Sequence, residues 1–280
     1  MVYIQIVDDD LIQKKPSKST LNIYPIPLFV GHLQHFYHVR GEKPRIYISI
    51  RNATAFCCSL PLLALILCVS SSLYYDFYKV TKTHCLVYNV LPSISAAIGD
   101  SDTGRSVWRA FIFVHILPRY LACLAYGFYF YNSSYFPHKR RIYTCVVIAS
   151  TALHFFELNS LLVLTIFTSN EHHGLHVFGF SSFQVCALVH MFLHLILYKH
   201  SGRSLSGKLE RYSYRLKKSC FLSSILLLII CTYLYYRHNA YCEPYVFSAF
   251  SFFEYLLVVA NVMFHSTIRF DLYEQYMVVG

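Results

Sequence analysis

Charged and imidazole side chains interrupt the longest apolar runs of this chain. Arg119, Glu157, His190 and Glu254 lie in four separate runs, each near the middle of its run. A charge at the centre of a bilayer costs roughly 2.5–3.5 kcal/mol on insertion scales, so we expect these side chains to face one another rather than lipid. Such a group could bind an anion through Arg119 and hold a histidine as general base.

Spacing within the runs supports a shared polar face. His115 precedes Arg119 by four residues, which places both on one side of a helix. Glu254, Asn261 and His265 fall within about 20° of one line at ~100° per residue. The functional interpretation is a cavity open to the lumen, with His115, His190 or His238 as the base. The alternative is an ion-pair network that only holds the helices in register.

A second polar group lies between the last two apolar runs. Residues 236–244 read Tyr-Arg-His-Asn-Ala-Tyr-Cys-Glu-Pro, which gathers Arg237, His238, Asn239, Cys242 and Glu243 in one short segment. Because a long apolar run flanks it on each side, we expect this segment at a membrane surface. Its density of functional groups indicates either chemistry or a fixed structural clamp.

One weak metal pattern is present. His190 and His194 lie four residues apart on one helical face, and with His154 or Glu157 of a neighbouring helix they could bind zinc for an intramembrane hydrolase. Two histidines at this spacing arise easily by chance in a chain with 15 of them. We therefore predict no metal site and no cofactor. Glycine-rich phosphate loops, nucleophile elbows and His-Glu-Xaa-Xaa-His motifs are also missing from the sequence.

The elements that carry these residues are predicted to be membrane helices. The 280 residues are 56% hydrophobic and 14% charged, with a mean hydropathy of +0.43, and no soluble domain of this size has such a surface. The net charge of +10 comes from basic tracts between apolar runs. This pattern is typical of the positive-inside rule and does not indicate nucleic-acid binding. The predicted fold is an all-α polytopic membrane helix bundle.

Six spans are predicted, with the fifth the shortest. The basic tracts at 139–141 and 199–218 place both termini in the cytosol. We expect residues 1–51 to form a flexible cytosolic arm, 52–268 the membrane domain and 269–280 a short cytosolic tail. The loops 75–107, 169–176 and 237–244 then face the lumen. The predicted spans are about 52–74, 108–131, 142–167, 177–198, 219–236 and 245–266.

Cysteine usage is compatible with this topology. Of the ten cysteines, eight lie in or beside the apolar spans, where a thiol usually serves as a small packing residue. Only Cys85 and Cys242 fall in predicted lumenal loops. An oxidising lumen would allow these two to form a disulfide, and pairing or two free thiols remain equal alternatives.

Several short stretches, taken in order, have the pattern of a known family. They are Thr83-His84-Cys85, Leu91-Pro92-Ser93, Trp108-Arg109, His115 with Pro118-Arg119, Glu157, His190-Met191, Arg237-His238-Asn239 with Tyr241-Cys242-Glu243, Glu254-Tyr255, and Asn261 with Phe264-His265. Their order and spacing resemble the post-GPI attachment to proteins factor 2 family over about residues 53–271. His194 is not a residue of that pattern, which weakens the zinc hypothesis.

The resemblance implies a multi-pass protein of the Golgi membrane, or of the endoplasmic reticulum, that remodels the lipid of GPI anchors. The implied reaction is reacylation of a lyso-GPI intermediate with a saturated fatty acid, needed for stable surface expression of GPI-anchored proteins. The implied partners are GPI lipid or lyso-GPI-anchored proteins and other GPI-remodelling proteins. The alternatives are a non-catalytic escort for such lipids and the zinc-dependent hydrolase.

The resemblance also suggests roles for individual residues. Arg109, Arg119 or Arg237 would bind the inositol phosphate, since guanidinium pairs with phosphate in a bidentate manner. Glu157 or Glu254 would hold that arginine or orient the catalytic histidine. The remaining substrate-binding candidates are Asn239, Glu243, Asn261 and His265.

Overall fold

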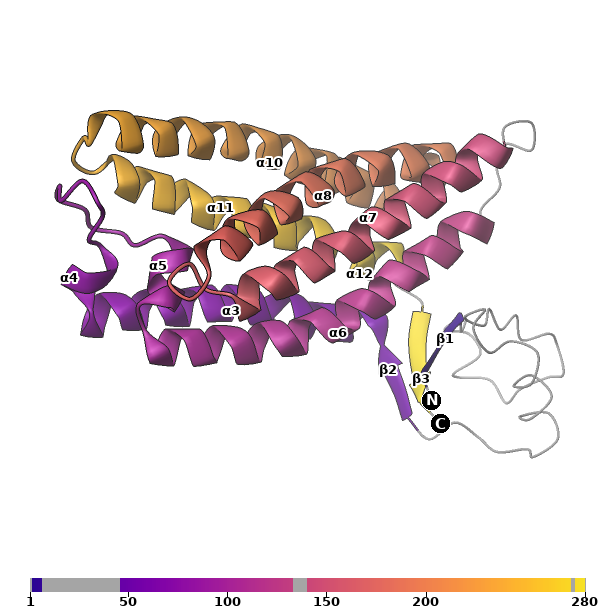
Figure 1. Ribbon diagram of the computed structural model, residues 1–280. Helices are drawn as coiled ribbons and strands as arrows, with labels where there is room; N and C mark the ends of the chain where they lie inside the picture. The colour runs from indigo at the N-terminus through magenta and orange to yellow at the C-terminus, as the bar shows by residue number, and fades with distance from the viewer. Residues whose placement is uncertain (1, 7–45, 133–139, 273–274, 280) are drawn as a thin grey trace, which may run out of the picture.

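The computed structural model describes residues 2–6, 46–132, 140–272 and 275–279. Six helices among these residues are long and apolar enough to cross a membrane, and they lie side by side as one elongated bundle (Figure 1). The predicted all-α polytopic bundle is therefore confirmed. The six helices are α3 (Ile50–Tyr75), α6 (Asp102–Asn132), α7 (Arg140–Ile166), α8 (His173–His200), α10 (Lys208–Tyr241) and α11 (Val246–Ser266).

Helices that follow one another in the chain pack as neighbours. α7 packs on α8, α10 on α11, and α6 on both α3 and α7. Gly179 shows how closely α8 approaches α7, since a Cβ atom there would lie 3.1 Å from the backbone nitrogen of Leu164. Small residues of this kind allow membrane helices to approach closely.

One end of the bundle is closed by short elements and loops, and we call it the disulfide end. Two short helices, α4 (Phe77–Val80) and α5 (Ile94–Gly99), lie there before α6 (Figure 1). Ser93 caps α5 by accepting a hydrogen bond from the Ala96 N–H at 3.1 Å. Asn170 donates to Asp100 at 2.8 Å, and Tyr245 N–H donates to the Tyr88 carbonyl at 3.0 Å. The last two contacts join the predicted loop 75–107 to the predicted loop 169–176 and to the start of α11.

The opposite end, the terminal end, contains both chain termini (Figure 1). The short helices α9 (Arg203–Ser206) and α12 (Ile268–Asp271) lie toward this end of the bundle. A small antiparallel sheet in the order β1-β3-β2 joins β1 (Val2–Ile6), β2 (Ile46–Ser49) and β3 (Gln275–Val279). Val279 is the register partner of both Val2 and Ile46. The sequence did not predict this sheet, and residues 7–45 of the predicted arm lie outside the described residues.

The helix that contains the predicted fifth span, 219–236, extends beyond it at both ends. α10 has 34 residues, which makes it the longest described helix. The basic tract from Lys208 continues the helix instead of forming a loop, and Lys217 within it is fully buried. At the other end, the polar segment up to Tyr241 is the last part of α10. The helix that contains the predicted second span likewise begins before it, at Asp102.

Apolar packing occurs in two main clusters along the bundle. The cluster toward the disulfide end includes Leu65, Ile112 and Phe183. The cluster toward the terminal end includes Phe130, Val147 and Tyr198. The positions between them on α6, α7, α8 and α11 carry the buried charged and imidazole side chains.

Candidate functional site

The centre of the bundle contains a buried ion pair. α6 contributes Arg119 and α7 contributes Glu157, and Arg119 Nη2 donates to Glu157 Oε1 at 2.8 Å. The two side chains are 6% and 0% exposed. The expectation that these two residues face each other is correct.

Two residues of α11 share the same carboxylate oxygen. Glu157 Oε1 lies 3.1 Å from His265 Nε2 and 3.5 Å from Asn261 Nδ2. Three helices therefore meet at one carboxylate, as the common phase of Asn261 and His265 suggested. Among the described residues, Glu157 Oε2 and Arg119 Nε are buried without a hydrogen-bond partner. The central group thus retains one acceptor and one N–H donor for a ligand.

Three histidines stack beside this carboxylate. The ring centroids of His154 and His190 are 4.4 Å apart, and those of His154 and His265 are 4.9 Å apart. His190 Nδ1 lies 3.0 Å from the Ser150 carbonyl oxygen, to which it can donate. His154 was predicted only as a possible zinc ligand, and its spacing of three residues from Glu157 is the sequence signal that it shares the same face.

These three histidines differ from the zinc set that the sequence suggested. One ligand nitrogen from each of His154, His190 and His265 lies within 4.8 Å of the others. His194 instead packs against aromatic rings, with centroids 4.5 Å from Tyr126 and 5.1 Å from Phe130. Arg119 Nη2 approaches His154 Nε2 at 3.4 Å. Because a guanidinium only donates hydrogen bonds, it uses the lone pair of Nε2 that a metal ion would need. A fixed positive charge at this position opposes binding of a second cation.

His115 lies one helical turn from Arg119 and is 2% exposed. Its Nδ1 is 2.7 Å from the Cys57 carbonyl oxygen on α3. A carbonyl only accepts, so Nδ1 carries the proton and the neutral ring has its lone pair on Nε2. Cys57 was not singled out from the sequence, because a buried cysteine is usually only a packing residue.

Two pockets meet at Arg119, which lines both of them. The disulfide pocket, with about 80 Å³ of space, runs from Arg119, His115 and Asn261 to Ser95 and His176. The terminal pocket, with about 70 Å³, runs from Arg119, His154 and His265 to Ile50 and Leu272. One water molecule requires only ~10–15 Å³ by a comparable measure. The walls of both pockets are mainly apolar, as binding of a lipid would require.

Glu254 is placed differently from the prediction. Its Oε2 accepts a hydrogen bond from the Ile94 N–H at 2.9 Å, so it satisfies a free donor at the start of α5. The predicted direct contact with Arg119 and Glu157 is replaced by this interaction, because α5 folds back against α11. Glu254 still lines the disulfide pocket.

The polar candidate residues at the disulfide end interact with nearby helix ends and loops. Arg109 donates to the Ile166 carbonyl at 2.5 Å and pairs with Glu171 at 3.0 Å. Arg237 pairs with Glu243, and Asn239 donates to the Tyr235 carbonyl one turn earlier in α10, at 2.9 Å. The structure does not bring these candidate residues together with Arg119 and Glu157.

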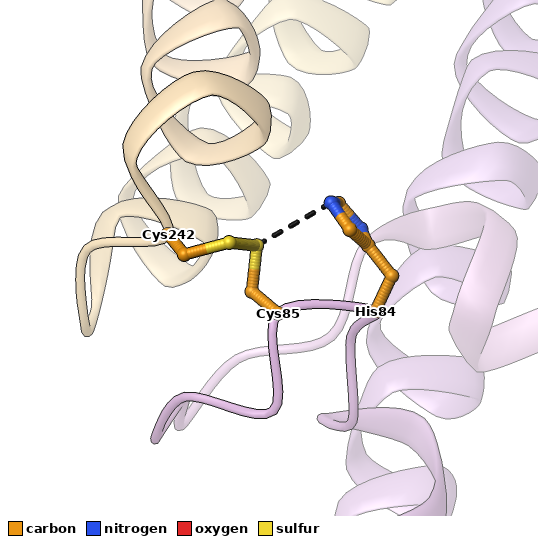
Figure 2. Close-up of side chains that lie close together, drawn as sticks. All are labelled: His84, Cys85 and Cys242. Carbon is orange, nitrogen blue, oxygen red and sulfur yellow. Dashed lines mark hydrogen bonds between the residues drawn. A yellow bond between two sulfur atoms is a disulfide. The ribbon is translucent and has the colours of Figure 1, made fainter.

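The alternative in which Cys85 and Cys242 pair is confirmed. The two cysteines form a disulfide with a Cα–Cα distance of 5.2 Å, and His84 Nε2 lies 3.3 Å from Cys85 Sγ (Figure 2). His238 is 1% exposed, and its ring packs on those of His84 and Phe247, with centroids 5.4 and 4.9 Å away. His238 therefore belongs to the packing around the disulfide rather than to the central group.

Sequence reasoning missed a second buried ion pair at the terminal end. Lys217 of α10 and Asp271 of α12 are both 1% exposed and form a salt bridge. Asp271 also accepts hydrogen bonds from Ser213 at 2.6 Å, Tyr126 at 2.5 Å and Tyr198 at 2.9 Å. Lys217 lies in a basic tract and Asp271 in a predicted cytosolic tail, and side chains in such segments are usually exposed to solvent.

The fold and site together define a polytopic membrane protein with a buried arginine, glutamate and histidine centre between two apolar pockets. A family model described as the Frag1/DRAM/Sfk1/Cwh43P N-terminal domain matches residues 52–275. The chain belongs to the post-GPI attachment to proteins factor 2 family, within that broader group.

Curated relatives support this membership over most of their length. The chain is 35% identical to Post-GPI attachment to proteins factor 2 of Caenorhabditis elegans, covering 79% of this chain and 84% of the relative. It is 34% identical to Acyltransferase PGAP2 of Xenopus tropicalis, covering 83% and 91%. It is 36% identical to Post-GPI attachment to proteins factor 2 of Drosophila melanogaster, covering 77% and 82%. No solved structure matches the chain.

Proposed function

We propose that this protein remodels GPI anchors by reacylating a lyso-GPI intermediate with a saturated fatty acid. The names of the relatives support a role in GPI-anchor maturation, and the Xenopus tropicalis relative is named an acyltransferase. One structural observation carries the proposal. Arg119 is 5% exposed, its Nε has no partner among the described residues, and it lies where the two pockets meet.

His115 is the proposed general base. The lyso-lipid hydroxyl is a weak nucleophile, so its proton must be removed as it attacks the acyl carbonyl. The bond from His115 Nδ1 to the Cys57 carbonyl at 2.7 Å fixes the tautomer that has a free lone pair on Nε2. Because the ring lines the disulfide pocket, it is placed to act on a hydroxyl bound there.

Arg119 is the proposed electrostatic catalyst. Negative charge develops on the acyl carbonyl oxygen during attack, and a preorganised N–H donor in a dry site stabilises it strongly. The Nε–H of Arg119 is available, because the interaction with Glu157 uses Nη2. Glu157, with Asn261 and His265 around it, keeps the guanidinium in place. No cofactor is required besides the acyl donor.

We propose that the disulfide end faces the lumen of the Golgi, or of the endoplasmic reticulum. Disulfides persist in oxidising compartments, and the Cys85–Cys242 bond lies at that end. The basic tract from Lys199 to Lys218 leads to the terminal end, which by the positive-inside rule places the termini in the cytosol. The lumenal side is also where a lyso-GPI-anchored protein would present its lipid.

Lipid mass spectrometry of GPI anchors tests the proposal in cells that lack the protein. Rescue with wild type and with the exposed-histidine control His173→Gln should convert lyso-GPI to diacyl anchors. His115→Gln and Arg119→Lys should leave lyso-GPI accumulated, at matched abundance of the folded protein. Full rescue by both variants would contradict the catalytic proposal and favour the non-catalytic escort.

A zinc-dependent lipid hydrolase is a second candidate, favoured by the proximity of His154, His190 and His265. It predicts stoichiometric zinc in the purified protein and loss of that zinc in His190→Gln. Elemental analysis by mass spectrometry distinguishes the two candidates, because the acyltransferase requires no bound metal.

A further inference from the structure

The two pockets differ in the residues they place beside Arg119. The disulfide pocket offers His115 and Asn261 at its inner end. The terminal pocket offers His154 and His265. One guanidinium thus separates two chambers that each contain imidazole, an arrangement that a single-substrate lipid site would not need.

The pockets also extend toward opposite ends of the bundle. The disulfide pocket reaches Ser95 of α5 and His176 of α8, which interact with each other at 2.9 Å. The terminal pocket reaches Ile50 at the start of α3 and Leu272 after α12. A ligand in each pocket would therefore bring its reactive group to Arg119 from a different end.

The mainly apolar lining of the terminal pocket suits an alkyl chain, and a neighbouring cation suits an anionic carrier. Small side chains of α3 and α6 line it, including Ala53, Thr54, Ala122 and Ala125. Arg269, whose Nε has no hydrogen-bond partner among the described residues, directly follows the lining residue Ile268 in the sequence. A cation next to the pocket lining suits the phosphates of coenzyme A or of a phospholipid headgroup.

We propose that the two pockets divide the two substrates of the transfer. The terminal pocket takes a fatty acyl donor with a phosphate-bearing carrier, and the disulfide pocket takes the lyso-lipid acceptor. This inference rests on the proposed acyl transfer and adds the route by which each substrate enters. Donor and acceptor meet at Arg119 without passing each other.

The chemistry balances without a redox partner. A bond forms between the acceptor hydroxyl oxygen and the acyl carbonyl carbon. The bond from that carbon to the donor's sulfur, in a thioester, or to its oxygen, in a phospholipid ester, breaks. The hydroxyl proton passes to His115, which then gives it to the leaving sulfur or oxygen and returns to its neutral form.

Photocrosslinking of the full chain in nanodiscs tests this division. The donor probes are stearoyl-coenzyme A and phosphatidylcholine, each with a diazirine on the acyl chain, and the acceptor probe is lysophosphatidylinositol with the same group. We expect one or both donor probes to label peptides of the terminal pocket and the acceptor to label those of the disulfide pocket. The donor that labels identifies the carrier. Donor and acceptor labels in the same pocket, or labels in neither, would overturn the inference.

Blocking variants with matched controls give a second readout. Ala122→Trp should reduce donor labelling at least tenfold without reducing acceptor labelling, whereas the exposed Ala55→Trp on α3 should change neither. Val258→Trp should block the acceptor, with the adjacent exposed Val259→Trp as control. If one blocking variant reduces labelling by both probes equally in a folded protein, the division is wrong.

An acyl-transfer assay on the same nanodiscs separates this inference from the proposed function. Separate labelling without transfer would remove the acyltransferase proposal and leave two distinct lipid pockets. Acyl transfer with both substrates labelled in one pocket would support the acyltransferase proposal and contradict the assignment of one substrate to each pocket.

Discussion

Arg119 Nη2 lies 2.8 Å from Glu157 Oε1, and this bond joins α6 to α7 in the middle of the bundle. His265 of α11 approaches the same oxygen at 3.1 Å. The pair therefore has two separable consequences. It holds three helices together, and it fixes the guanidinium that we assign to catalysis.

Loss of one partner of this pair should destabilise the protein strongly. Glu157→Gln leaves the buried cation of Arg119 uncompensated, and breaking a buried ion pair from one side costs about 3–5 kcal/mol. We expect a lower melting temperature of the purified protein in detergent. The double variant Arg119→Met/Glu157→Leu, which removes both charges, should recover most of the stability and remain inactive in lipid rescue. Recovery of activity as well would show that the pair is only structural.

The central group was largely predictable because membrane depth and helical phase are both readable from sequence. Arg119 and Glu157 follow from their depth, and Asn261 and His265 follow from their phase on α11. Glu254 has the right phase too, but its partner is the backbone of α5, a short helix in a region predicted to be a loop. His238 shows the opposite error, since a segment dense in functional groups proved to be packing around a disulfide.

The second buried pair gives an independent test of the terminal end. Asp271→Asn removes the charge that compensates Lys217, with both side chains 1% exposed, and should cost about 3–5 kcal/mol. Asp102→Asn is the matched control, because the side chain of Asp102 is 97% exposed. Thermal unfolding of the two variants should differ clearly. Equal melting temperatures would show that Lys217 reaches solvent or another partner.

The disulfide should contribute to stability through the long loop that it closes. Cys85 and Cys242 are 157 residues apart, and removal of a native disulfide typically costs about 2–5 kcal/mol. Cys85→Ser/Cys242→Ser should therefore melt at a lower temperature than Cys145→Ser, a change at an exposed free cysteine. Mass spectrometry of non-reduced peptides should recover the Cys85–Cys242 crosslink from wild type. Its absence from protein isolated without reductant would contradict the assignment.

Glu171 predicts a specific acid response at the disulfide end. The Thr168 backbone N–H and hydroxyl donate to its carboxylate at 3.1 and 3.0 Å. These bonds, with Arg109 and Arg105 nearby, lower the pKa of Glu171 below its ordinary value of 4.5. The stabilisation is fully present above pH 4.5 and is lost as pH falls through the lowered pKa of the folded state.

Melting curves over a pH series check this response. Glu171→Gln should melt below wild type at neutral pH, and the difference should shrink as the pH falls below 4.5. A constant difference at every pH would show that ionisation of Glu171 does not contribute.

The bond between Cys85 and Cys242 also sets an order of events during biosynthesis. Cys85 precedes α6, whereas Cys242 follows α10, so four membrane helices must be made between the two thiols. Cys85 therefore cannot form this disulfide until α10, the fifth membrane helix, has been inserted and Cys242 has reached the same compartment. A chain that stalls before α10, or that inserts α10 the wrong way round, leaves Cys85 without its partner in the same compartment. The disulfide can therefore form only when α10 has been inserted in the correct orientation, so its presence distinguishes correctly assembled bundles from misassembled ones.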